Sequence, residues 1–74
     1  MKKSIYDDEY RELITRLIEK RKSKGITQLQ LAEKMGIDNT IISKAENCVR
    51  RLDVIELLNI CRALDIKLSD ILVE

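Results

Sequence analysis

The sequence TQLQLAEKMGIDNTIISKAEN, residues 27–47, decides the fold predicted for this chain. Residues 28–35 and 39–46 are predicted to form two short helices, joined by a tight turn at residues 36–38. Gly36 lies where the first helix should end, and glycine readily adopts the left-handed conformation that commonly ends a helix. The stretch is therefore predicted to be a compact pair of crossing helices.

Each of these two helices is preceded by a capping residue. The side chains of Thr27 and Asp38 can accept hydrogen bonds from the first-turn amides. Six apolar residues recur at the spacing that turns side chains inward together: Leu31, Ala32, Met35, Ile37, Ile42 and Ala45. The second helix keeps an exposed face, composed of Asn39, Thr40, Ile41, Ser43 and Lys44. That face is predicted to bind a partner.

A family pattern runs through the same stretch. The pattern reads Thr-Gln-x-x-Leu-Ala-x-x-hydrophobic-Gly-hydrophobic, and further on hydrophobic-Ser-Lys/Arg-x-Glu. The residues that match it are Thr27, Gln28, Leu31, Ala32, Met35, Gly36, Ile37, Ile42, Ser43, Lys44 and Glu46. This stretch resembles the Cro/cI-type DNA-binding domains, also called lambda-repressor-like or XRE domains, and RRLDVIELLNICRALDI, residues 50–66, resembles their closing segment. The resemblance therefore covers about residues 10–73. The resemblance implies an all-α, five-helix single domain over residues 1–74, with its helix-turn-helix at about residues 28–47. Cys48 departs from the pattern, which has glycine there.

Composition argues against several other classes of protein. Apolar residues make up 45% of the chain, but no apolar run approaches the roughly 20 residues that cross a bilayer. The N-terminus lacks the apolar centre of a signal peptide. We therefore expect a soluble, cytoplasmic protein whose two cysteines are reduced. With no His, no cofactor loop and no carboxylate pair outside helix ends, we expect no enzyme, no metal and no other cofactor.

The distribution of charge indicates a polyanionic partner. From Lys20 to Arg51 eight basic residues face three acidic ones, a net charge of +5, whereas the whole chain carries only +1. The rest of the chain therefore sums to −4. A polyanion would find its binding surface on the middle third of the sequence.

The side chains of the exposed face can read base edges. Asn39 can pair with adenine, and Thr40 can hydrogen-bond a base or phosphate or place its methyl on thymine. Ile41 can offer only an apolar contact, and Lys44 can reach guanine acceptors or a phosphate. Ser43 is either a phosphate contact or a packing residue.

The family resemblance implies roles for residues around this face. It makes Gln28 a phosphate contact that braces Asn39, although a plain surface glutamine is the alternative. It pairs Arg21, on the buried stripe of the first helix, with Glu46 in a structural salt bridge. The alternative is a solvated arginine.

Arg50 and Arg51 follow the second helix of the motif in a loop. An arginine pair beside the groove would hold the DNA backbone without reading sequence. The alternative is a salt bridge within the fold, for example from Arg51 to Glu56.

Three further helices are predicted outside the motif. The first runs from Asp7 or Asp8 to Ser23, with an inner stripe of Tyr6, Tyr10, Leu13, Ile14, Leu17 and Ile18. The fourth begins at a capping box of Asp53 and Glu56, with an inner stripe of Val54, Leu57, Leu58, Cys61 and Leu64. The fifth is a last turn over residues 71–73, capped by Ser69.

These features predict a sequence-specific regulator of transcription, of repressor type, that binds double-stranded DNA. In relatives the last two helices often form a dimer interface, which implies a homodimer on a palindromic operator with half-sites about 34 Å apart. The alternative is a protein-interaction module or antitoxin-like partner that uses the motif only as a scaffold.

Overall fold

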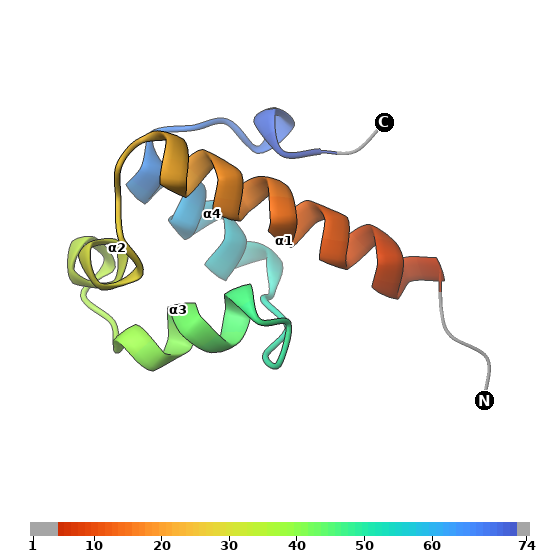
Figure 1. Ribbon diagram of the computed structural model, residues 1–74, viewed down its shortest axis with the longest axis horizontal. Helices are drawn as coiled ribbons and strands as arrows, with labels where there is room; N and C mark the ends of the chain where they lie inside the picture. The colour runs from red at the N-terminus through yellow and green to blue at the C-terminus, as the bar shows by residue number, and fades with distance from the viewer. Residues whose placement is uncertain (1–4, 73–74) are drawn as a thin grey trace.

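The computed structural model describes residues 5–72 of the chain, and the surroundings of side chains from residue 8 onward. Within this range there are four α-helices, one short 3₁₀ turn and no strands (Figure 1). The elements are α1 (Ile5–Ser23), α2 (Gln28–Met35), α3 (Asn39–Glu46), α4 (Val54–Leu64) and η1 (Leu68–Asp70). In the described residues no helix is both long and apolar enough to cross a membrane.

Local sequence signals set the bounds of α2 and α3. The Thr27 side chain accepts a hydrogen bond from the Gln30 amide, and the Gln30 side chain accepts one from the Thr27 amide. Gly36 ends α2 with a φ of 68°, in the left-handed region. Asp38 caps α3 by accepting a hydrogen bond from the Thr40 amide. The predicted bounds and caps of both helices are confirmed.

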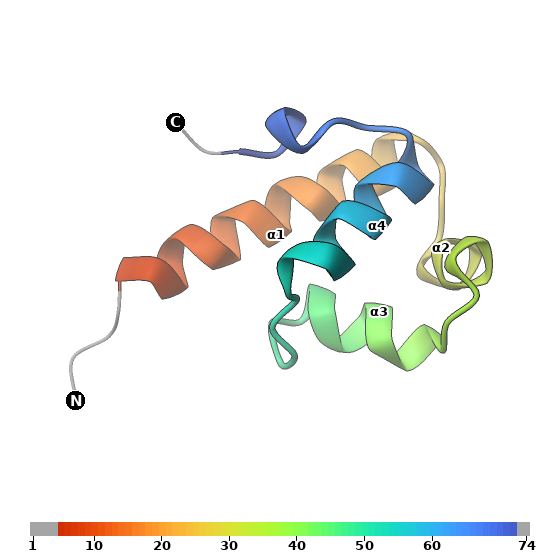
Figure 2. The ribbon, with the colours of Figure 1, turned by 180° about the vertical axis from the view of Figure 1, so that it is seen from behind.

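The core lies where the four helices meet. Figures 1 and 2 show α1 running along the length of the molecule and α4 overlapping it in both views, while α2 lies at one end and α3 along one side. α2 packs against both α3 and α4, and α1 packs against α3. The central buried cluster consists of Ile14, Leu17, Leu31, Ala32, Ile42, Ile60, Cys61, Leu64 and Ile71. Burial of each large aliphatic side chain contributes about 1.5–3 kcal/mol, and this packing stabilises helices too short to form alone.

The inner face of α4 differs from the prediction at two residues. Val54, predicted to face inward, has 69% of its surface exposed, whereas Ile60 is buried with 3% exposed. Val54 is the first residue of α4 and lies at the margin of the helix bundle. Ile60 lies one turn before Leu64 and belongs to the same buried cluster, so the inner stripe of α4 includes Ile60 in place of Val54.

The predicted fifth helix is wrong. Asp65 ends α4 with a φ of 57°, and the chain then forms only the three-residue 3₁₀ turn η1. Asp70, rather than Ser69, supplies the capping interaction, because its side chain accepts a hydrogen bond from the Lys67 amide at 2.9 Å. In a 3₁₀ turn residues three apart lie on the same side. This places Leu68 and the fully buried Ile71 together against the core within very few residues.

Two predictions fall partly outside the described residues. Val73, assigned to the last turn, lies beyond residue 72, and the surroundings of the Tyr6 side chain are not among those described. The first helix begins at Ile5, two or three residues before its predicted start at Asp7 or Asp8.

Candidate nucleic-acid interface

The predicted face of α3 is only partly exposed. Asn39, Thr40 and Lys44 are exposed, but Ile41 and Ser43 are half-buried. Ile41 was predicted to stand out on the polar face. Instead it lines a mostly apolar hollow of about 110 Å³ between α3 and α4, together with Ile37, Leu52 and others. α4 approaches α3 on this side, and therefore only the edge of Ile41 remains available for an apolar contact.

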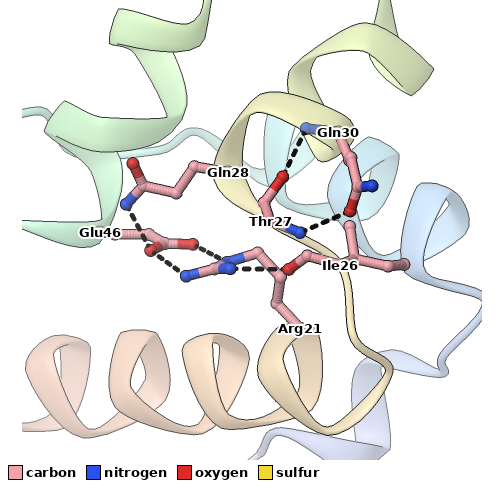
Figure 3. A network of polar contacts seen from close by, with 6 residues as sticks. All are labelled: Arg21, Ile26, Thr27, Gln28, Gln30 and Glu46. Carbon is pink, nitrogen blue, oxygen red and sulfur yellow. Dashed lines mark hydrogen bonds and ion pairs between the residues drawn. The ribbon is translucent and has the colours of Figure 1, made fainter.

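A buried ion pair fixes α3 against α1 (Figure 3). Arg21 has only 7% of its surface exposed. Its Nε donates to Glu46 Oε2 at 2.6 Å and its Nη2 to Glu46 Oε1 at 2.9 Å. Its Nη1 donates to the Ile26 carbonyl oxygen at 2.7 Å. The structure thus brings together the two residues that the family resemblance pairs, and each of the three guanidinium nitrogens donates a hydrogen bond.

Gln28 joins this network. Its Nε2 donates to Glu46 Oε1 at 2.8 Å, and the side chain is half-buried. Figure 3 shows Gln28 on α2 reaching across to Glu46 at the end of α3. The sequence prediction missed this contact, because it assigned Gln28 to phosphate and to Asn39. The result is that the first residue of α2 and the last residue of α3 are tied to α1 through one carboxylate.

The first turn of α3 carries a second polar arrangement. Asp38 Oδ1 accepts from the Thr40 amide at 2.9 Å and from the Thr40 hydroxyl at 3.0 Å. The backbone bond first, and the hydroxyl bond after it, hold the pKa of Asp38 below its usual range. Asp38 is therefore a carboxylate at neutral pH, at the exposed tip of the helix.

The loop after α3 is held by α1 and α4. Arg50 donates to both oxygens of Glu56, at 2.9 and 2.6 Å, so the salt bridge proposed for Arg51 is made by Arg50. Hydrogen bonding by Glu56 raises the pKa of Arg50, and hydrogen bonding by Arg50 lowers the pKa of Glu56. The Arg51 guanidinium instead lies over the Tyr10 ring, 4.3 Å from its centroid. Tyr10 also accepts a hydrogen bond from the Leu52 amide at 2.9 Å, a role that its position on an apolar stripe did not indicate.

Cys48, two residues after the end of α3, adopts an unusual backbone conformation. Cys48 has a φ of 59°, whereas Asn47 has a φ of −87°, so the cysteine occupies the left-handed position where the family pattern has glycine. A side chain in this conformation costs about 1 kcal/mol. The turn is held because the amides of Val49 and Arg50 both donate to the Lys44 carbonyl, at 2.9 and 3.1 Å.

A short helix presented by a capped two-helix hairpin, and locked to its support by a buried ion pair, defines a helix-turn-helix domain of the DNA-binding kind. A family model described as Helix-turn-helix matches residues 17–71, and the chain belongs to that family, in its XRE branch. Among the solved structures that match is an XRE-family like protein from Pseudomonas syringae pv. tomato. The two sequences are 39% identical, and the match covers 90% of this chain and 82% of the other chain, with a TM-score of 0.87. No curated protein matches the chain.

Proposed function

We propose that this protein is a transcriptional repressor that inserts α3 into the major groove of a specific DNA operator. The observation that carries the proposal is the exposed row Asn39, Thr40 and Lys44 on a helix whose opposite end is fixed by the buried Arg21–Glu46 pair. Rigid support matters because base readout requires side chains placed in advance of binding. Occupancy of the operator would then block polymerase sterically.

Asn39 and Lys44 of the row, and two residues beside it, have chemical roles in this proposal. Asn39 would pair with adenine, and Lys44 would donate to guanine O6 and N7 or to a phosphate. The exposed edge of Ile41 would contact a thymine methyl group. Ser43 is half-buried beside the row and would contact a phosphate at its margin.

Residues on both flanks would bind the backbone. Gln28 retains a second amide hydrogen beyond the one given to Glu46, and this hydrogen is available for a phosphate. Arg51 carries a positive charge on the exposed surface of the loop, ordered by the Tyr10 ring. Arg50 would contribute in part, since Glu56 already compensates much of its charge. These contacts would set affinity and register without reading sequence.

We further propose that the protein acts as a homodimer on a palindromic operator. An apolar hollow of about 120 Å³ lies between α1 and the start of α4, and its lining includes Leu13, Leu57 and the exposed Val54. Ile55, the next residue of α4, is 64% exposed. A second copy would remove these apolar surfaces from water and place two recognition helices about one DNA turn, 34 Å, apart. Because DNA is the ligand, we place the protein in the cytoplasm.

The same exposed apolar residues favour the second candidate function, a protein-interaction module or antitoxin-like partner. In that case α3 would serve only as scaffold. Salt dependence separates the two functions, because release of counterions from DNA makes binding fall steeply with salt, whereas apolar association does not.

Selection of binding sites from a random duplex pool tests the proposal. We expect one enriched sequence with two-fold symmetry, bound with an affinity that decreases linearly in log–log form with salt concentration. Sedimentation of the same protein sample should give a dimer. Failure to enrich any sequence would refute base-specific binding, and enrichment of a single asymmetric half-site would refute the dimer.

A further inference from the structure

The hydroxyl of Thr40 has a defined hydrogen-bond direction. Its oxygen lies 3.0 Å from Asp38 Oδ1. An ionised carboxylate carries no proton and can only accept, so the single hydroxyl proton must belong to this bond. The lowered pKa of Asp38 keeps that carboxylate ionised. The two lone pairs of the Thr40 oxygen are what the exposed side chain offers to a ligand.

Asp38 strengthens this acceptor character. Oδ1 of Asp38 accepts hydrogen bonds from both the amide and the hydroxyl of Thr40. The Asp38 side chain is exposed at the tip of α3. Two neighbouring side chains therefore present oxygen lone pairs and negative charge. Such a tip is repelled by phosphate oxygens, and also by the carbonyl oxygens of guanine and thymine. It is suited to the exocyclic amines of adenine and cytosine, which are hydrogen-bond donors in the major groove.

One turn further along the same face the chemistry is reversed. Lys44 has only donors, and its ammonium group suits the guanine acceptors O6 and N7. Residues four apart on a helix lie on the same side, so Thr40 and Lys44 face the same groove. The helix therefore presents acceptors at its first turn and donors at its last.

We infer that Thr40, oriented by Asp38, is a specificity-determining residue that accepts a hydrogen bond from the amine of an adenine or cytosine on the strand it contacts. This inference rests on the proposed function and names the bases that one part of the site selects. It makes Asp38 a positioning residue, whose contribution is the direction of the Thr40 hydroxyl.

The first experiment is site selection from a random duplex pool with wild type and three variants. Thr40→Val removes the hydroxyl but keeps the shape, and we expect it to lose base preference at one position of the half-site. Thr40→Ser keeps the hydroxyl and should retain the preference there. Lys44→Met is the matched control, and should lose preference at a different position.

The second experiment identifies the atom that is read. At the position that depends on Thr40, cytosine is replaced by 2-pyrimidinone, or adenine by purine, so that only the exocyclic amine is lost. Wild type should bind this duplex roughly tenfold more weakly, the effect of one lost hydrogen bond whose partner stays unpaired. Thr40→Val should bind the altered and unaltered duplexes equally. A wild type that is insensitive to the missing amine would overturn the inference.

A fourth variant tests Asp38. Asp38→Gly removes the carboxylate while glycine remains an acceptable N-terminal cap. The Thr40 hydroxyl could then donate, and its position should newly accept guanine or thymine on the contacted strand. An unchanged preference would remove Asp38 from the mechanism. If Lys44→Met shifts the selected sequence while Thr40→Val does not, this inference alone fails. If wild type selects no sequence, the proposed function fails with it.

Discussion

Replacing Glu46 by glutamine would test how strongly the buried ion pair holds the recognition helix. The carboxylate accepts two hydrogen bonds from Arg21 and one from Gln28, over distances of 2.6–2.9 Å. The side chains of both ion-pair partners are only 8% exposed. Glu46→Gln keeps the shape but leaves the arginine charge without a counter-ion, and its amide group directs hydrogens at the guanidinium.

The expected cost is about 3–5 kcal/mol, the range measured when one partner of a buried pair is removed. A chain of 74 residues has a free energy of unfolding of about 4–11 kcal/mol. Each kcal/mol lost from a domain of this size lowers Tm by about 4–8 °C. A loss of about 3 kcal/mol therefore lowers Tm by about 12 °C or more.

The assay is thermal and urea unfolding followed by circular dichroism. Glu12→Gln provides the matched control, because Glu12 pairs with Arg16 at 3.8 Å on the exposed surface of α1. An exposed pair four residues apart contributes only about 0.3–0.5 kcal/mol. If the two glutamine variants unfolded at the same temperature, the buried pair would not be holding α3, and the reasoning would be refuted.

Other residues give predictions that can be checked independently. Lys44→Ala should weaken operator binding by about 1–3 kcal/mol in a mobility-shift assay with no change in Tm, and unchanged affinity would mean that the α3 face is misassigned. Arg51→Ala should weaken specific and random DNA alike and reduce the salt slope by about 1, so an unaltered slope would show that Arg51 makes no phosphate contact. Tyr10→Phe should cost about 1–3 kcal/mol in urea unfolding, because the Leu52 amide loses its acceptor, and a neutral effect would argue against that bond. Hydrogen bonding lowers the pKa of Glu56, so its contribution to stability is present above the ordinary glutamate pKa and is lost as pH falls through the lowered value. Acid titration of Glu56→Gln should therefore show a smaller loss of stability than wild type, and equal curves would contradict the assignment.

The sequence by itself determined the helix-turn-helix. Thr27, Gly36 and Asp38 act on backbone groups two to four residues away, so their effects can be predicted without knowing the rest of the fold. The inward residues of α2 and α3 follow from helical spacing for the same reason. Family resemblance extended this to the pairing of Arg21 with Glu46, which no local rule would supply.

Only the tertiary structure decided which arginine of the loop meets Glu56 and what Tyr10 does. Both depend on the path of the chain between Glu46 and Asp53, where Cys48 takes a left-handed conformation that the sequence does not require.

The end of the chain and the face of Ile41 were decided in the same way. Ile71 is fully buried. Between the end of α4 at Leu64 and this buried residue, the chain forms the short 3₁₀ turn η1 and no fifth helix. Ile41 is half-buried in the hollow that it shares with residues of α4. Local patterns specify which residues form a helix. The surface that remains exposed depends instead on how the helices pack, and helix packing joins residues that lie far apart in the sequence.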